Sequence, residues 1–367
     1  MRAFTRPTNR ARPLGEQVST RDRIIVAALL SVGILTATAA PALASSYAVT
    51  GLGSLGFGTT VATGINASGQ ITGESYLATE VQIPCTDRRH KGPCFTHPVH
   101  AFLWSHGTMT DLGTLGGLDS AGNAINDLGE VVGTSGTTTG SLVESTAFAD
   151  QNGVMTAINS GDAFAVNDSG EIAGGGSFPV AGTPGDVFQQ AFTFQNGTTT
   201  VLGLLPGEGG IFTDASGING SGEVVGSGDN SQSDERAWKY QNGVMTDLGT
   251  LGGPQASAEA VNSSGQIVGF AQTSSDANEG FLYSGGKMTG LGLNVYPDAI
   301  NDHGVIVGQG TGGAVIDSGG TVQNLNSLVP AGSGITLNNA VGINDNGQIV
   351  ANGSSTAGQT AFLLTPS

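Results

Sequence analysis

The sequence predicts an all-β fold, a seven-bladed β-propeller with four strands per blade, closed by pairing of the N- and C-terminal strands. Three observations lead to this prediction. A ten-residue motif occurs seven times, a second hairpin motif recurs between its copies, and the two ends of the repeat region supply complementary parts of one repeat. The mean period of about 46 residues lies in the range of four-stranded propeller blades.

The ten-residue motif, as in AINDLGEVVG at 124–133, predicts a tight hairpin. An Asn caps a type I turn through its side chain, and a Gly three residues later adopts the left-handed conformation. An apolar pair on each side of this turn belongs to the two strands that it joins. We interpret the recurrent asparagines first of all as turn residues: Asn66, Asn126, Asn167, Asn219, Asn262, Asn301 and Asn344.

A second hairpin recurs between these copies, most completely as HAFLWSHGTMTDLGTLGG at 100–117 and in RAWKYQNGVMTDLGTLGG at 236–253. Asn-Gly or Gly-Gly between two short strands is a strong hairpin signal. The two hairpins together give four strands per repeat. Consecutive apolar residues, such as Val131-Val132, indicate strands covered on both faces, whereas the alternation at 109–112 indicates an outer strand.

The chain ends provide a test of ring closure. YAVTGLGSLG at 47–56 resembles a fourth strand with no strands before it, and TAFLL at 360–364 resembles a third strand with no fourth strand after it. The two fragments complete one blade, and closure removes exposed sheet edges. The alternative is an open β-solenoid, whose coils are usually shorter and need no complementary ends.

Residues 1–44 are predicted to be a signal peptide, and residues 45–367 a single propeller domain. Six arginines precede an apolar run at 24–39, and Pro41-Ala42-Leu43-Ala44 ends in an A-x-A pattern. A membrane anchor is the alternative, but the run is shorter than the about 20 residues that a span needs. We therefore expect a secreted or periplasmic protein with no membrane span after cleavage.

The charge balance excludes some partners. The leader holds six of the 12 basic residues and two of the 29 acidic ones, so residues 45–367 carry a formal charge of −21. Nucleic acids and anionic membranes need clustered Lys and Arg, so neither is an expected partner. No HExxH or G-x-S-x-G motif is present, which favours a non-enzymatic binding protein. We expect this protein to be a monomer.

The combined motifs HAFLWSHGTMTDLGTLGG and AINDLGEVVG resemble the HAF-type extracellular repeat family of bacteria, named for the triad that stands here as His100-Ala101-Phe102. The resemblance covers essentially all of residues 45–367. The copies at 146, 280 and 313 depart from it, with TAF, GFL and GAV in place of the triad. The resemblance implies secretion and a propeller-like β fold, and it implies no established activity.

The longest insertion, IPCTDRRHKGPCFTHPVH at 83–100, contains both cysteines. In an exported protein, Cys85 and Cys94 are predicted to form a disulfide. A zinc site from Cys85, Cys94, His97 and His100 is the alternative, although its spacing is loose. A basic cluster in the same loop could hold an anionic sugar or a partner's carboxylates, or could be a solvated loop tip: Arg88, Arg89, His90 and Lys91.

Carboxylates recur where the first strand of a repeat begins, at the expected mouth of the central channel. Oxygen ligands that converge there could bind Ca²⁺, the one cofactor that the sequence suggests. Acidic residues are also common in turns, which is the alternative explanation. The five candidates are Asp119, Asp162, Asp214, Glu259 and Asp298.

These observations predict an exported bacterial binding or scaffold module whose ligand is a glycan or a cell-surface protein. The alternative is a carbohydrate-active enzyme, a lyase or glycosidase, with carboxylates at the channel mouth, because paired carboxylates could come from different blades. A third possibility is a cell-surface protein that only forms layers.

Overall fold

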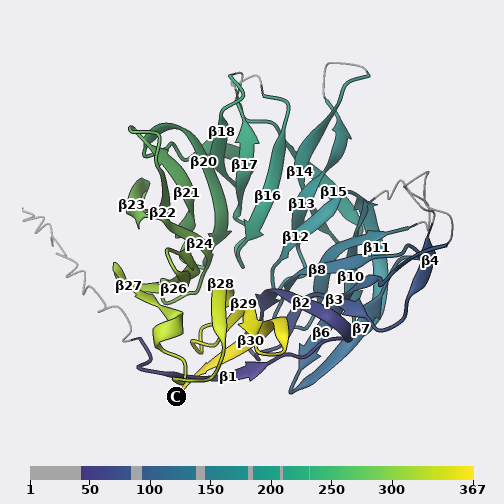
Figure 1. The fold of residues 1–367 in the computed structure, drawn as a ribbon. Helices are drawn as coiled ribbons and strands as arrows, with labels where there is room; N and C mark the ends of the chain where they lie inside the picture. The colour runs from purple at the N-terminus through teal and green to yellow at the C-terminus, as the bar shows by residue number, and fades with distance from the viewer. Residues whose placement is uncertain (1–42, 84–92, 138–144, 181–184, 207–209, 231) are drawn as a thin grey trace, which may run out of the picture. The chain divides into compact units, whose positions relative to one another are not determined.

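The computed structural model describes residues 43–83, 93–137, 145–180, 185–206, 210–230 and 232–367. The chain divides into two units, Met1–Ala39 and Ala40–Ser367, and all described residues belong to the second. That unit contains seven four-stranded antiparallel sheets and one two-stranded sheet among its described residues. The seven sheets are arranged as blades around a centre, which confirms the predicted seven-bladed propeller (Figure 1).

Blades 2 to 6 each consist of four consecutive strands, whereas blade 1 contains an insertion and blade 7 includes the first strand, β1. Blade 1 contains β2 (Gly56–Ile65), β3 (Ile71–Leu77), β6 (Val99–Ser105) and β7 (Thr108–Gly113). Blade 2 contains β8 (Ser120–Ile125), β9 (Val131–Gly136), β10 (Ser145–Gln151) and β11 (Val154–Ser160). Blade 3 contains β12 (Asp162–Val166), β13 (Ile172–Pro179), β14 (Val187–Gln195) and β15 (Thr198–Gly203). A two-stranded hairpin, β4 (Val81–Ile83) and β5 (Cys94–Thr96), is inserted into blade 1 between β3 and β6.

Blade 4 contains β16 (Thr213–Ile218), β17 (Val224–Asp229), β18 (Glu235–Gln241) and β19 (Val244–Asp247). Blade 5 contains β20 (Gly252–Val261), β21 (Ile267–Thr273), β22 (Asn278–Ser284) and β23 (Lys287–Leu293). Blade 6 contains β24 (Val295–Ile300), β25 (Val305–Gly310), β26 (Gly313–Ser318) and β27 (Thr321–Asn324). A 3₁₀ turn, η1 (Leu325–Ser327), follows. In the described part of the chain, no helix is long and apolar enough to cross a membrane.

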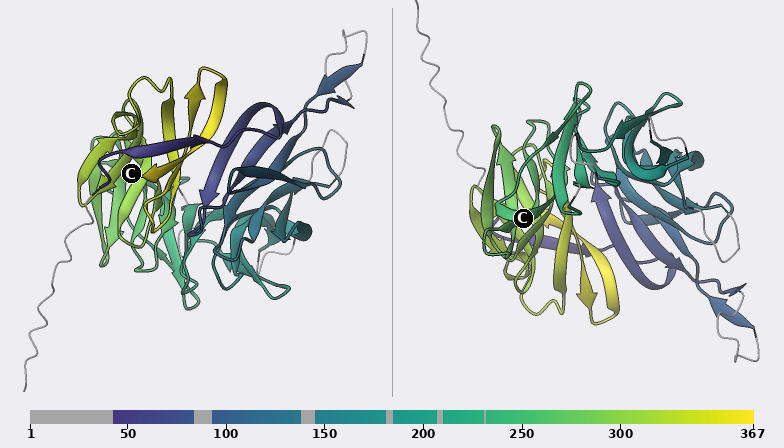
Figure 2. Two further views of the ribbon diagram at one scale, coloured as in Figure 1. Left: turned by 90° about the horizontal axis from the view of Figure 1, so that it is seen from below. Right: turned by 90° about the horizontal axis from the view of Figure 1, so that it is seen from above.

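Blade 7 closes the ring. It combines β28 (Thr336–Ile343), β29 (Ile349–Ser355) and β30 (Gly358–Pro366) from the end of the chain with β1 (Tyr47–Gly51) from its beginning. Strand β1 runs antiparallel to β30, with Tyr47 opposite Pro366 and Gly51 opposite Phe362. The two strands lie side by side in both further views (Figure 2). The predicted closure by terminal strands is therefore confirmed.

Both predicted turns have the expected backbone. In the ten-residue motif, the amide of Gly69 donates to the carbonyl of Asn66 at 3.0 Å, and Gly69 has a φ of +77°. In the second hairpin, both central residues have positive φ, as at Asn152 (57°) and Gly153 (79°). This is the type I′ geometry that joins two tightly paired strands.

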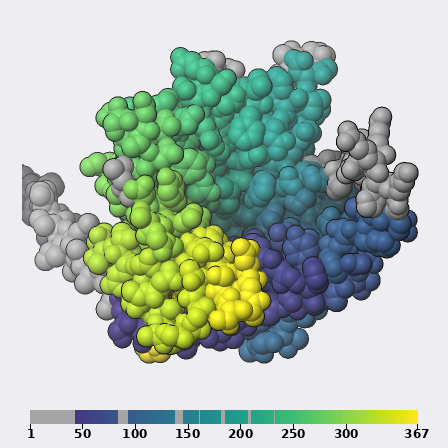
Figure 3. Space-filling model, viewed as in Figure 1, coloured from purple at the N-terminus to yellow at the C-terminus, as the bar shows by residue number. Residues whose placement is uncertain are grey.

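The core lies between neighbouring blades, which are in contact around the ring (Figure 3). The aromatic residue of the third strand is fully buried in five blades, and each occurrence packs against an adjacent sheet: Phe102, Phe148, Phe192, Trp238 and Phe281. Val131 and Val132 are both fully buried, as expected of a strand that is covered on both faces.

Candidate functional site

The ten-residue motif builds the wall of the central channel in stacked rings. Its first three letters contribute a ring of Gly or Ala, a ring of Ile or Val, and a ring of Asn, each with one member per blade. Cavities of about 280 and 350 Å³ lie along these rings. The small side chains leave room at the axis, and the repeated pattern makes this part of the channel nearly the same in every blade.

A β-bulge precedes these rings in every blade. The register between the first and second strands shifts at the residue three positions before the motif's Asn. A bulge redirects a side chain relative to the regular ladder. We call these seven residues the bulge ring: Thr63, Asn123, Phe164, Ser216, Glu259, Asp298 and Val341.

All seven members of the bulge ring line one cavity of about 590 Å³ at the mouth of the channel. The lining also includes Phe212 and Asp214 at the beginning of blade 4 and Asn339 of blade 7. The cavity is therefore bounded by acids, amides, hydroxyls and aromatic rings. No Lys, Arg or His is among its described lining residues.

Glu259 and Asp298 are neighbours in the bulge ring, on blades 5 and 6. Removal from bulk water raises the pKa of Asp298 to about 7, and the nearby charge of Glu259 adds to this effect. The side chain of Asp298 is exposed to the cavity, although the channel wall surrounds it. Burial also raises the pKa of Glu259, against a hydrogen bond of 3.1 Å from Ser257 Oγ. The pair resists carrying two negative charges.

Asp214 forms a second acidic point of the cavity. Burial raises its pKa to about 6, a hydrogen bond from Gln189 Nε2 at 2.9 Å opposes the shift, and the charge of Asp162 adds to it. Asp162 itself accepts a hydrogen bond from Thr134 Oγ1 at 2.7 Å and is not among the lining residues. Asp162 thus influences the site through its charge.

The five predicted calcium ligands do not converge. Relative to the Asn of their motif copies, Asp119 lies seven residues upstream, Asp162 and Asp214 five, and Glu259 and Asp298 three, so they occupy different levels. Asp119 instead accepts a hydrogen bond from the amide of Val99 at 2.9 Å. In the described parts of the chain, no three Asp, Glu, His or Cys side chains are grouped as a metal site. Calcium binding stays a prediction.

Three neutral members of the bulge ring connect adjacent blades. Thr63 Oγ1 donates to the carbonyl of Gly122 at 2.7 Å, and Asn123 Nδ2 donates to the carbonyl of Ala163 at 2.8 Å. In the same way, Ser216 Oγ donates to the carbonyl of Ala258 at 2.6 Å. Each acceptor is the residue that precedes the bulge in the next blade.

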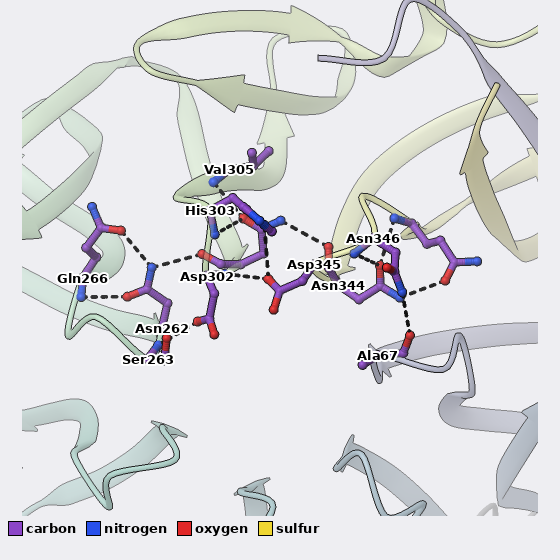
Figure 4. A network of polar contacts seen from close by, with 12 residues as sticks. Ala67, Asn262, Ser263, Gln266, Asp302, His303, Val305, Asn344, Asp345 and Asn346 are labelled. Carbon is purple, nitrogen blue, oxygen red and sulfur yellow. Dashed lines mark hydrogen bonds and ion pairs between the residues drawn. The ribbon is translucent and has the colours of Figure 1, made fainter. Parts of the chain in front are cut away.

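The Asn ring is a closed circle of hydrogen bonds at the other end of the channel. The Nδ2 atom of each Asn donates to the main-chain carbonyl of the Asn in the next blade, over 3.0 to 3.1 Å, and Asn344 returns to Asn66. The Oδ1 atom meanwhile caps its own turn. In blade 5, Asn262 Oδ1 accepts from the amide of Gln266 at 3.0 Å (Figure 4). It also accepts from the amide of Ser264 at 3.1 Å. The sequence predicts the capping of the turn by the Asn, but it gives no sign of the hydrogen bond to the next blade.

A partial outer circle follows one residue later. The main-chain amide of the residue after the Asn donates a hydrogen bond to the next blade wherever the equivalent residue there is Asp. The amide of Ser263 donates to Asp302 Oδ1 at 2.8 Å, and the amide of Asp302 donates to Asp345 Oδ1 at 2.9 Å (Figure 4). Blade 7 uses Asn346 instead, whose Nδ2 donates to the carbonyl of Ala67 at 2.9 Å. These contacts connect adjacent blades at this mouth of the channel.

The other predicted site lies mostly outside the described residues. Arg88, Arg89, His90, Lys91 and Cys85 are not described, so the basic binding cluster and the Cys85–Cys94 disulfide stay predictions. The two histidines of the alternative zinc site have other contacts. His97 Nδ1 lies 2.9 Å from the carbonyl of Leu77, and its ring stacks on Phe57. His100 Nδ1 lies 2.8 Å from Asp111 Oδ1.

No protein-family model and no curated protein matches the chain. Among solved structures, it is similar to TolB from Acinetobacter baumannii, at 12% identity and a TM-score of 0.40, over 73% of this chain and 60% of that one. It is similar to the propeller domain of the Trilobed protease from Pyrococcus furiosus, at 9% identity and a TM-score of 0.49, over 83% and 95%. An acylaminoacyl peptidase from Pyrococcus horikoshii matches at 8% and 0.49, over 84% of this chain and 51% of that one. At these identities the likeness concerns the β-propeller fold alone.

Proposed function

We propose that this chain is an exported binding module of the HAF repeat type, and that the bulge-ring cavity is its ligand site. One observation carries the proposal. The rings of Gly or Ala, Ile or Val, and Asn are nearly the same in all blades, whereas the seven bulge-ring residues span acid, amide, hydroxyl, aromatic and aliphatic side chains. A cavity of about 590 Å³ with a few placed polar groups is typical of small-ligand sites.

A binding screen tests this proposal. The purified protein is titrated with arrays of glycans, amines and short peptides, and binding is followed by calorimetry. We expect at least one class to bind, and Asn123→Ala and Phe164→Ala, which change opposite kinds of bulge-ring chemistry, to weaken that binding by about tenfold or more. The matched control Val154→Ala changes an exposed residue of an outer strand and is expected to leave binding unchanged. Binding that survives every bulge-ring substitution contradicts the proposal.

A carbohydrate-active enzyme is the second candidate, and the Glu259–Asp298 pair favours it. A carboxyl group with a pKa near 7 can act as a general acid at neutral pH, while an ionised carboxylate beside it acts as base or nucleophile. The test is polysaccharide turnover by the wild-type protein and by Asp298→Asn and Glu259→Gln. Turnover that disappears in both variants without loss of thermal stability supports this function. Binding without turnover supports the binding module.

Export is a separate part of the proposal, supported by the sequence of residues 1–44. Expression of the full chain in a bacterial host, followed by N-terminal sequencing, provides the test. We expect the exported protein to begin at Ser45. A protein that keeps its first residues and stays in the cytoplasm contradicts this part and leaves the binding proposal untouched.

A further inference from the structure

The repeats give an internal comparison at the bulge ring. Where the bulge residue is Thr63, Asn123 or Ser216, its side chain donates a hydrogen bond to the main-chain carbonyl just before the bulge of the next blade. All three bonds are short, between 2.6 and 2.8 Å. In these three blades, a donor side chain at the bulge therefore satisfies the main-chain carbonyl of the next blade from the cavity side.

Blades 5 and 6 have the opposite chemistry at the same position. An ionised Glu259 or Asp298 contains only acceptors, and the equivalent carbonyls of the next blades belong to Pro297 and Ala340. Among the described residues, no side chain donates to either of these two carbonyls, and none donates to Asp298. Blades 5 and 6 thus carry acceptors at the position where blades 1, 2 and 4 carry donors. Among the described residues, Ser257 Oγ is the one side-chain donor to the pair, and it donates to Glu259.

The rest of the described cavity lining supplies no positively charged donor. It contains no Lys, Arg or His, and Asp214 adds a third acid on the adjacent blade. Phe164 and Phe212 add apolar surface to the same lining. A ligand that fits must bring several donors and positive charge at one end and an apolar body behind them. A primary ammonium has three donors and no acceptor.

We propose that the bulge-ring cavity binds a primary alkylammonium group, held between the carboxylates of Glu259 and Asp298 and the carbonyl of the next blade, with its alkyl chain against the aromatic part of the lining. This inference rests on the proposed function, because it names the ligand class of the same site. The ammonium group belongs either to a free amine or to a lysine side chain of a partner protein.

Calorimetric titration of the purified protein at pH 8 and low ionic strength tests the inference, because the pKa of Asp298 is raised to about 7 and both carboxyl groups must be ionised. The probes are cadaverine, Nα-acetyl-lysine amide and its uncharged isostere Nα-acetyl-norleucine amide. We expect an amine to bind at least about tenfold more tightly than the norleucine compound. Binding of cadaverine alone indicates a free amine as the source, and binding of the lysine compound indicates a partner's lysine.

Two substitutions separate binding from folding. Glu259→Ser introduces the hydroxyl that Ser216 has at the same position, so the variant is expected to melt at the wild-type temperature or above and to lose amine binding by about tenfold or more. Asp298→Asn is expected to lose binding by a similar factor. Glu80→Gln, which removes one negative charge from an exposed side chain near the β4–β5 hairpin, is expected to keep it.

The outcomes distinguish this inference from the proposed function. Binding of the norleucine compound as tight as that of both amines, or full amine binding by Glu259→Ser, overturns the ammonium site. Binding of a neutral glycan that depends on Asn123 and Asp298, without any amine binding, also overturns it and leaves the binding module standing. If neither amines, glycans nor peptides bind, both proposals are wrong.

Discussion

At the scale of single residues, the Asn of the ten-residue motif has two partners in different blades. Its oxygen caps its own turn, which any sequence reader expects from Asn-x-x-Gly. Its amide nitrogen donates to the next blade, and Asn262 Nδ2 contacts both the carbonyl of Asn301 at 3.0 Å and Gln266 Oε1 at 2.8 Å. The hydrogen bond to the next blade depends on how neighbouring turns are placed in space, and a local motif contains no information about that.

Replacing Asn262 by Asp tests the energetic contribution of the hydrogen bond between blades. The carboxylate keeps the acceptor for the amides of Ser264 and Gln266 but places a negative charge against the carbonyl of Asn301. We expect a loss of about 2 to 3 kcal/mol in the free energy of unfolding, because the group is buried and loses a donor. Urea unfolding measures it. Ser263→Ala, at the exposed neighbour, is the control, and equal unfolding midpoints for the two variants would contradict this contribution.

Asp150 gives a prediction about pH. Its Oδ1 accepts from the amide of Gly153 at 3.0 Å, while its buried Oδ2 has no partner among the described residues, and burial raises the pKa of the carboxyl. A raised pKa in the folded state means that stability is highest below the unfolded value of about 3.9 and falls as pH rises through the folded pKa.

We therefore expect Asp150→Asn to gain stability relative to the wild type as pH rises from about 4 to about 8. Unfolding free energies at both ends of this range measure the trend. Asp317 occupies the same position in blade 6, is also buried with one unpartnered oxygen, and has a pKa raised by burial. Asp317→Asn is therefore an independent replicate. A difference that is constant with pH, or that grows towards acid, would show that the buried charge is not the cause.

At the scale of elements, the last letter of the motif is explained by the bulge. A Cβ on Gly133 would lie 2.0 Å from the carbonyl oxygen of Ala121 in the paired strand, and five further motif copies show the same conflict at their last Gly. The seventh copy ends in Ala351 instead. There β28 shifts its register a second time, between Leu337 and Asn339, next to the position that faces this residue. We attribute the space for the Ala351 methyl group to this extra shift.

Gly133→Ala should therefore cost about 2 to 3 kcal/mol, because the backbone oxygen cannot move away without breaking the ladder. Chemical denaturation provides the measurement. The matched control is Ala351→Gly, which only removes a methyl group where the strand already accommodates one, and we expect a loss of about 1 kcal/mol. Similar losses for both substitutions would show that the close approach has little energetic effect.

The bulge also explains which part of the site could be predicted from the sequence. The turns, strand pairing and blade count follow from local patterns. Of the five acids that the sequence suggests, Asp214, Glu259 and Asp298 line the bulge-ring cavity. Bulges depend on pairing between strands and have no letter pattern of their own. Without them, Asp119 could not be distinguished from Asp298, and Phe164 and Asn123 gave no reason to be singled out.

At the scale of the whole molecule, the first strand of the chain belongs to the last blade. Tyr47 is buried in the core between blades 6 and 7, together with Leu325, Leu337, Ile349 and Leu364. Its amide also donates to the carbonyl of Leu328 at 2.9 Å. The complementary ends of the repeat region made this closure predictable from sequence, because a propeller that lacks it leaves a sheet edge exposed.

Tyr47→Ala is expected to destabilise the propeller by about 3 to 5 kcal/mol, as for other buried aromatic residues. Because the side chain holds the closing strand, fluorescence and circular dichroism should report one shared transition at lower denaturant concentration. Tyr76→Ala removes a tyrosine that is 39% exposed on β3 and serves as the control. A near-wild-type midpoint for Tyr47→Ala would mean that the ends contribute little to the ring.

The bulge ring has a practical consequence for engineering. Its seven positions stand next to each other in space but far apart along the chain, and each is flanked by residues whose identities are nearly fixed by packing. Randomising these codons together would produce a combinatorial library on a framework whose turns and packed core keep their sequence, from which receptors for unrelated small molecules could be selected without redesigning a single loop.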